Sequence, residues 1–104
     1  MSDHPDSLDL VLEPADNERL RNVCGQLDEH LRQVERRLGI EINNRGNSFR
    51  LLGDAAAIAA GREVLQDLYQ ASAEETLSPA SVHLHLQAAG VDALLEDADE
   101  VPET

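Results

Sequence analysis

The sequence predicts a small α+β domain that has a three-stranded, mostly antiparallel sheet with helices packed on one face. Apolar and polar residues alternate on both sides of a turn in residues 40–54, which is typical of a β-hairpin with one buried face. The segments before and after this hairpin have the apolar spacing of helices. The strands are too few, and the hairpin too direct, for a parallel doubly wound sheet. A chain of 104 residues is long enough for one core.

The first predicted element is a strand. Residues 1–7 are polar and indicate a disordered lead-in to the domain. Leucines then occupy every second position from Leu8 to Leu12, and this alternation predicts a strand that ends at Glu13-Pro14. The chain is therefore expected to enter the domain through the sheet.

Two helices follow this strand, and a glycine ends each of them. Asp16 is a suitable N-cap for the first helix, which ends at Gly25. The second helix ends at Gly39. Its apolar residues lie at positions i, i+4, i+7 and i+11 and predict one apolar stripe, made of Leu27, Leu31, Val34 and Leu38.

The hairpin and a third helix continue the domain. The turn of the hairpin is placed at residues 44–47, where Asn and Gly tolerate the positive φ of tight turns. Gly53 and Asp54 then supply a turn and an N-cap for an alanine-rich helix that runs to Tyr69. Its small side chains allow the helix to approach the sheet closely.

A further helix is appended at the carboxyl end. Ser78 is a good cap, and the proline that follows it suits the first position of a helix, which ends at Gly90. The domain is therefore expected to span residues 8–89. Residues 90–104 are mostly acidic and indicate a solvated tail or a linker.

The charge is distributed unevenly along the chain. The net charge of −13 argues against a nucleic-acid partner, because phosphates repel an acidic protein over about 8 Å at physiological salt. All eight basic residues are arginines within residues 19–62, however, where five acidic residues oppose them and leave a net charge of +3. A mildly basic middle between acidic ends keeps an RNA partner among the expectations.

The sequence also predicts a cytoplasmic protein without a membrane partner. Cys24 is the single cysteine and has no partner for an internal disulfide. The amino end lacks the basic and apolar regions of a signal peptide, and no apolar run approaches the length of a membrane span.

The predicted order of strand, helix, helix, strand, strand and helix resembles a type I KH domain, which begins with its strand. Residues 31–69 carry this resemblance, from "LRQVERRLGIEI" to "GREVLQDLY". Residues 13–53 look more particularly like the amino-terminal region of PhoH-like ATPases, and "CGQLDEHLRQVERRLGIEI" is the most specific part. The resemblance covers residues 8–96.

The resemblance implies that an ATPase domain follows this region in the parent protein. This chain contains no G-x-x-x-x-G-K-[ST] motif and no lysine, so it has no P-loop for nucleotide phosphates. ATP and magnesium are therefore expected in the missing ATPase domain alone. The chain itself is expected to hold no cofactor and to have no catalytic activity.

The resemblance also implies where RNA would bind. KH domains use a G-x-x-G loop between two helices to approach a nucleic-acid backbone. Gly25 and Gln26 begin the corresponding link here, but Asp28 stands at the second glycine position and Glu29 follows it. The two carboxylates would repel phosphate. The alternative interpretation is that Gly25 ends one helix and Asp28 caps the next.

Four arginines are further candidates for binding RNA. Arg32 and Arg36 are four residues apart on the second helix, Arg45 lies in the hairpin turn, and Arg50 lies on the strand after it. If the helix and the hairpin border one groove, these side chains could contact phosphates or stack on bases. Alternatively, they belong to a solvated face on which Glu29 and Glu35 pair with arginines.

No residue pattern predicts a catalytic or metal site. His83 and His85 are two positions apart on a predicted helix, where their side chains diverge. Cys24 lies near the carboxyl end of a helix, where the helix dipole disfavours a thiolate, so it is expected to pack in the core. The expected function is to bind RNA or to place the ATPase on RNA or ribosome-associated targets. The alternative is a module for protein interaction or oligomerisation of the ATPase.

Overall fold

The computed structural model describes residues 6–88. The elements follow the predicted order, with one additional 3-10 turn, η1: β1 (Asp6–Val11), α1 (Asn17–Cys24), η1 (Gln26–Asp28), α2 (Glu29–Leu38), β2 (Glu41–Arg45), β3 (Ser48–Gly53), α3 (Ala55–Ser72) and α4 (Pro79–Ala88). Within this part of the chain, no helix is both long enough and apolar enough to cross a membrane.

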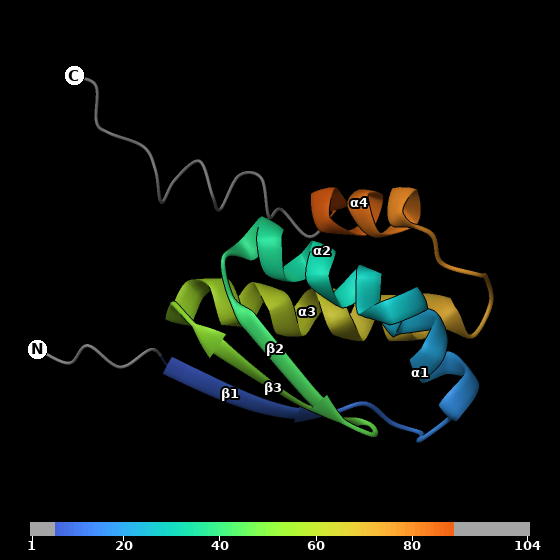
Figure 1. Ribbon diagram of the computed structural model, residues 1–104, viewed down its shortest axis with the longest axis horizontal. Coiled ribbons are helices and arrows are strands. Elements are labelled where there is room, and N and C mark those ends of the chain that lie inside the picture. The colour runs from blue at the N-terminus through green and yellow to red at the C-terminus, as the bar shows by residue number, and fades with distance from the viewer. Residues whose placement is uncertain (1–5, 89–104) are drawn as a thin grey trace, which may run out of the picture.

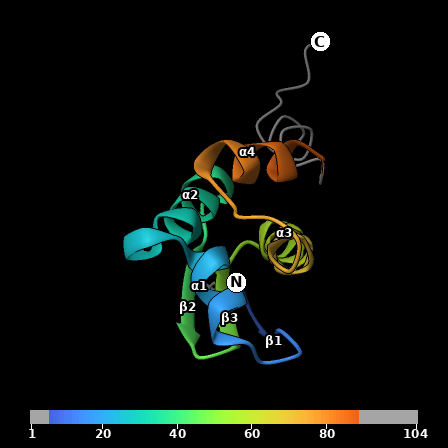
Figure 2. The same ribbon diagram turned by 90° about the vertical axis from the view of Figure 1, so that its right-hand side faces the viewer.

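The three strands form one sheet in the order β1-β3-β2, and both pairs are antiparallel. The helices α1, α2 and α3 lie on one side of this sheet, and α4 lies beyond α2 and α3 (Figures 1 and 2). The prediction of an α+β domain with a small antiparallel sheet, helices on one face and an appended helix is confirmed.

The core lies between the sheet and α3. Phe49 and Leu51 of β3 are fully buried, as are Val64, Leu65 and Leu68 of α3. The close approach of α3 depends on Gly61, because a Cβ added there would lie 2.8 Å from Leu51 Cδ2. Small residues on α3 thus allow the helix to sit directly on the sheet, as the sequence predicted.

The predicted helix ends are also observed. The Asp16 carboxylate accepts hydrogen bonds from two backbone N–H groups at the start of α1, and the Asp54 carboxylate accepts one at the start of α3. The Ser78 hydroxyl accepts a hydrogen bond from Ser81 N–H at 3.2 Å at the start of α4. Gly25 and Gly39 end α1 and α2 with positive φ.

Some element bounds differ from the prediction. β1 begins at Asp6, where it pairs with Gly53, so residues 6 and 7 belong to the sheet. α3 continues to Ser72, three residues beyond the predicted end. The expected acidic tail, residues 90–104, lies outside the described residues.

The prediction that Leu27 belongs to the apolar stripe of α2 is wrong. α2 begins at Glu29, and Leu27 lies before it in η1, where its side chain is 95% exposed. His30 lies in the core instead, with 3% of its surface exposed. The reason is that the backbone turns away from the α2 axis at Gly25, Leu27 and Asp28, which all have positive φ. Asp28 consequently makes no side-chain cap, contrary to the alternative interpretation of this link.

Tyr69 of α3 ties the β1–α1 connection to the helical layer. Its hydroxyl donates a hydrogen bond to the Pro14 carbonyl and accepts one from Asp16 N–H at 3.1 Å. The Arg19 guanidinium lies over the Tyr69 ring, 4.1 Å from its centroid, and donates to the Tyr69 carbonyl at 2.8 Å. These contacts fix α1, and with it the start of the link to α2.

Candidate nucleic-acid interface

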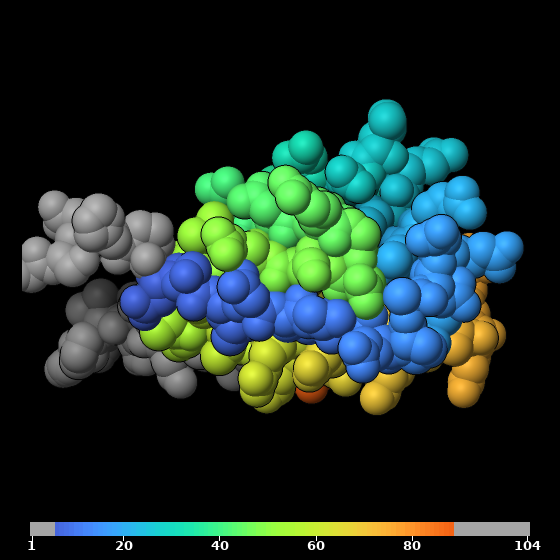
Figure 3. All heavy atoms as spheres, turned by 90° about the horizontal axis from the view of Figure 1, so that it is seen from below, coloured from blue at the N-terminus to red at the C-terminus, as the bar shows by residue number. Residues whose placement is uncertain are grey.

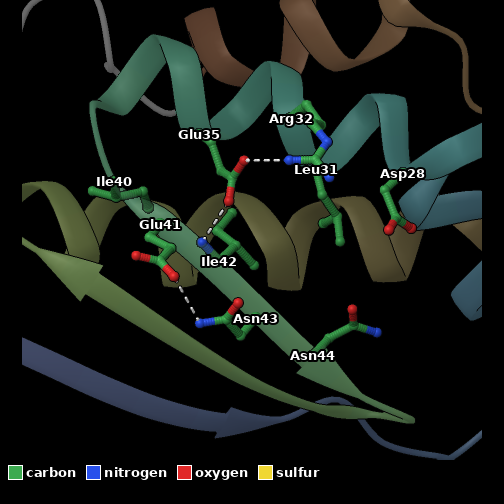
Figure 4. A pocket seen from close by; sticks show the side chains of 9 residues that line it. All are labelled: Asp28, Leu31, Arg32, Glu35, Ile40, Glu41, Ile42, Asn43 and Asn44. Carbon is green, nitrogen blue, oxygen red and sulfur yellow. Dashed lines mark hydrogen bonds and ion pairs between the residues drawn. The ribbon is translucent and has the colours of Figure 1, made fainter.

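An open groove with a volume of about 540 Å³ runs between α2 and β2. The start of α2 and the edge of the sheet form its two walls (Figure 4). The lining residues are Asp28, Leu31, Arg32 and Glu35 on the helical side, and Ile40, Glu41, Ile42, Asn43 and Asn44 on the strand side.

The strand wall is an unpaired sheet edge, because β2 is the last strand in the order β1-β3-β2. In an antiparallel pair, successive residues direct their backbone groups alternately toward and away from the partner strand. Ile42 N–H is directed away from β3, since it donates to Glu35 Oε2 at 2.7 Å. Asn44 lies two residues after Ile42, so its backbone N–H and carbonyl are also directed away from β3 and face the groove.

The groove carries more acidic than basic groups. Arg32 Nη1 lies 3.7 Å from Glu35 Oε1, and this guanidinium is 63% exposed. Glu41 lies on the opposite wall and accepts a hydrogen bond from Asn43 Nδ2 at 3.2 Å. Asp28 stands at one end of the groove (Figure 4). Three carboxylates and one guanidinium favour hydrogen-bond donors and cations as ligands over phosphate groups.

The link between α1 and α2 has a structural role at its first residue. Gly25 has φ 79° and ψ −180°, a conformation that is essentially restricted to glycine. A Cβ added there would lie 2.8 Å from the buried His30 ring. The ring in turn holds the link, because His30 Nδ1 hydrogen-bonds the Asn22 carbonyl at 3.0 Å.

Two backbone N–H groups of the link donate hydrogen bonds within it. Asp28 N–H donates to the Gly25 carbonyl at 3.2 Å, and Glu29 N–H donates to the Gln26 carbonyl. Gln26 is exposed but does not line the groove. The predicted RNA-binding residues Gly25 and Gln26 therefore lie next to the groove, beyond its acidic end.

The four arginines predicted to bind RNA are divided between two surfaces. Arg32 lines the groove, and Arg36 lies one turn further along α2, exposed to solvent. Arg45 and Arg50 line a second hollow of about 570 Å³. Its lining residues belong to the three strands, whose face away from the helices is seen uncovered in Figure 3. We call this second hollow the outer hollow; its lining residues are Asp9, Leu10, Val11, Asn43, Asn44, Arg45, Ser48, Phe49 and Arg50.

Arg50 already has a partner in the outer hollow. Its Nε donates to Asp9 Oδ1 of β1 at 2.8 Å, across the register pair Asp9–Arg50. This hydrogen bond lowers the pKa of Asp9 below its usual value. The sequence could not indicate the pair, because the two residues are 41 positions apart.

Cys24 and the histidines lie where the sequence predicted. Cys24 is buried, and burial, with a smaller contribution from the charge of Asp28, raises the pKa of its thiol to about 11. His83 Nδ1 lies 2.9 Å from Arg37 Nη1, and His85 Nε2 lies 3.8 Å from Glu75 Oε2. In residues 6–88 no three potential metal ligands come together.

Sequence reasoning missed the role of Glu35 and Asn44 in the groove. Glu35 was expected to pair with an arginine, which it does, but its second oxygen also binds the edge of β2. Their role depends on the position of β2 at the edge of the sheet, which the sequence analysis did not predict. Polar residues on a predicted edge strand and on the helix before it are the signal that would have identified them.

No family model matches the chain. Three similar solved structures are a protein of unknown function from Aeropyrum pernix, Dim2p from Pyrococcus horikoshii OT3, and a chain of the a/eIF2alpha-aDim2p-rRNA complex from the same source. The first has a TM-score of 0.70 and 13% identity, over 93% of this chain and 52% of that chain. Dim2p has a TM-score of 0.67 and 15% identity, over 84% and 51%. The third has a TM-score of 0.66 and 13% identity, over 88% and 50%.

These likenesses concern the fold. The chain spans about half the length of each solved structure, with 13–15% identity. Together with the order of elements and strands, they give the chain a KH-like fold with an additional carboxyl-terminal helix. None of these likenesses is to a PhoH-like protein.

Proposed function

We propose that this chain is a non-catalytic, RNA-binding module that acts in the cytoplasm. The observation that carries the proposal is the groove between α2 and the unpaired edge of β2. Outward backbone groups of Asn44 and the side-chain amides of Asn43 and Asn44 offer donors and acceptors of the kind that read the edges of unpaired bases. A KH-like fold supports the proposal, since Dim2p has a similar fold and occurs in a complex that contains rRNA.

The charges of the groove determine how RNA would lie in it. Asp28, Glu35 and Glu41 repel phosphates, so the bases would enter the groove and the backbone would remain outside. Arg32 and Arg36 lie on the same helix at a spacing of four residues and provide a phosphate-contacting rim. With two such contacts, the binding would be weak and sensitive to salt.

The test is an NMR titration of the isotope-labelled chain with a single-stranded RNA octamer of mixed sequence, at 50 and 150 mM salt. We expect salt-sensitive shifts in residues 28–32 and 40–44. The double variant R32E/R36E should weaken binding at least about tenfold at the lower salt, because it replaces two attractive contacts by repulsive ones.

A matched control makes this experiment specific. The double variant R45E/R62E makes the same change of charge away from the groove, in the outer hollow and on an exposed part of α3. It should bind the octamer more tightly than R32E/R36E by at least about fivefold. An absence of shifts with wild-type protein, or an equal loss in both variants, would overturn the proposal.

A second candidate function is to bind a basic segment of a partner protein. The observation that favours it is the excess of carboxylates in the groove, beside an unpaired strand edge that an extended peptide could join. E35Q separates the two functions, because it removes a charge and keeps an acceptor for Ile42 N–H. The variant should bind RNA more tightly and a basic peptide less tightly than wild type.

We further propose that the module places an attached P-loop ATPase on RNA or on ribosome-associated targets. Support comes from the resemblance of residues 13–53 to PhoH-like ATPases. ATP and magnesium would then bind in that ATPase. In a chain that joins both parts, R32E/R36E should remove the stimulation of ATP hydrolysis by RNA and leave hydrolysis without RNA unchanged. Equal stimulation in the variant would contradict this role.

A further inference from the structure

The loop between α1 and α2 presents an apolar side chain to solvent. Leu27 is 95% exposed, although most of the leucines in residues 6–88 are buried. It is flanked by polar and acidic residues, namely Gln26, Asp28 and Glu29. We call residues 26–29 the Leu27 loop.

The backbone of the Leu27 loop is strained at the same place. Leu27 has φ 53° and ψ 32°, and Asp28 has φ 60° and ψ 28°. Left-handed conformations are unfavourable for residues with a Cβ, and two in succession are uncommon. Outliers of this kind concentrate at ligand clamps and binding sites, where the strain places a side chain for a purpose. Here the strain places a leucine in solvent instead of in the core.

A second exposed apolar side chain, this one beside a positive charge, lies on the uncovered face of the sheet. Val11 of β1 is 51% exposed and lines the outer hollow with Arg45, the last residue of β2. Arg50 is bound to Asp9, whereas within residues 6–88 Arg45 makes no ion pair. The outer hollow therefore combines an exposed apolar side chain with an available guanidinium.

The two surfaces are complementary, but they do not meet within one molecule. The exposed Leu27 is flanked by the carboxylates of Asp28 and Glu29. In the outer hollow, most of whose lining residues are polar, the exposed Val11 lies with the guanidinium of Arg45. An apolar contact and an attraction between opposite charges can therefore form together. Leu27 does not fill the hollow of its own chain, since it is almost fully exposed. Each copy carries one Leu27 loop and one outer hollow, so the loop of one copy can bind in the hollow of a second copy.

We propose that the chain self-associates head to tail, with the Leu27 loop of one copy in the outer hollow of the next. The contact is heterologous, because two different surfaces meet, and it leaves a loop at one end and a hollow at the other. It assigns a role to Val11 and Arg45, which do not line the RNA groove. The loop shares Asp28 with that groove, and the outer hollow shares Asn43 and Asn44 with it, so the test uses variants at positions that line only one of the two sites.

The test is sedimentation of the full chain at 150 mM salt, from 10 µM to 1 mM. The average mass of wild type should rise with concentration. L27D and V11D should each raise the dissociation constant at least about tenfold, because either change puts a charge into an apolar contact. Both positions are exposed, so both variants should stay folded, which thermal unfolding checks.

A mixture of the two variants gives the decisive measurement. L27D keeps an intact hollow and V11D keeps an intact loop, so an equimolar mixture should form a heterodimer and nothing larger. The matched control is L84D, since Leu84 of α4 is 62% exposed and belongs to neither surface. L84D should associate as wild type does.

Three outcomes would overturn the proposal. They are a wild-type protein that stays monomeric up to 1 mM, a loss of association in L84D equal to that in L27D, and a mixture that forms no heterodimer. RNA titrations of V11D provide the separation from the proposed function. V11D should lose association and keep RNA binding, and R32E/R36E should lose RNA binding and keep association. The failure of one proposal can therefore be told apart from the failure of the other.

Discussion

Two short connections in this domain each contain a glycine with positive φ, but they differ in how closely other residues pack around that glycine. The hairpin turn between Arg45 and Ser48 is open, and a Cβ added at Gly46 would meet nothing within 4 Å. The link between α1 and α2 is packed, because a Cβ at Gly25 would lie 2.8 Å from the His30 ring. Both glycines have positive φ, at 60° and 79°.

The difference shows that the same local signal has two kinds of cause. In the turn, the conformation is required by the geometry that joins two antiparallel strands. In the link, tertiary packing also excludes a side chain, since the buried His30 ring occupies the space where a Cβ of residue 25 would lie. A glycine in the turn can therefore be replaced at a modest cost, and a glycine in the link cannot.

Replacing each glycine by alanine tests this difference directly and should give the largest effect. G25A should lower the free energy of unfolding by about 3 kcal/mol or more, since it adds a clash to an unfavourable backbone conformation. G46A should cost about 1–2 kcal/mol, which is the left-handed penalty alone. Urea unfolding followed by circular dichroism measures both. Equal losses in the two variants would show that His30 does not confine Gly25.

The reactivity of Cys24, which lies next to the link, measures how well this region excludes solvent. Its thiol pKa is raised from 9.0 to about 11 by burial. At pH 8 the folded chain should therefore react with iodoacetamide about 100-fold more slowly than the unfolded chain, because only the thiolate reacts. Mass spectrometry of timed samples gives the rates. G46A should react like wild type, and a fast reaction of the native protein would contradict the packed link.

The smallest expected effect concerns strain in the link. L27N should raise the free energy of unfolding by about 0.5–1 kcal/mol, because asparagine tolerates a left-handed backbone better than leucine does. The exposed leucine loses no packing within the chain. L84N is the matched control in α4 and should lower stability by about 0.5 kcal/mol, since asparagine is a poorer helix former. Thermal unfolding at low protein concentration separates these effects from self-association.

Local patterns predicted most of the fold. The alternation in residues 40–54 corresponds to β2 and β3. The turn predicted at 44–47 contains the observed connection, residues 46–47, although Asn44 and Arg45 belong to β2. Asp16, Asp54 and Ser78 cap the helices that they were expected to start. These features depend on residues close together in the sequence, so tertiary contacts had little to change.

The candidate site was less predictable. Arg32 lies in the groove as expected, but Arg45 and Arg50 lie on another face. The hairpin and α2 do border a common groove, but alternate residues of a strand point to opposite sides of the sheet. Which of these sides faces the groove depends on the place of β2 in the strand order, and no local pattern contains that information.

The sequence by itself determined the α+β class, the element order, the helix caps and the burial of Cys24, because periodicity and capping act within a few residues. The tertiary structure decided the strand order β1-β3-β2, the pairing of Arg50 with Asp9, and the replacement of Leu27 by His30 in the core. Each of these depends on the space and partners offered by segments that are distant in the chain. The physical reason is that packing and strand pairing are satisfied for the whole domain at once, whereas local propensities are satisfied one element at a time.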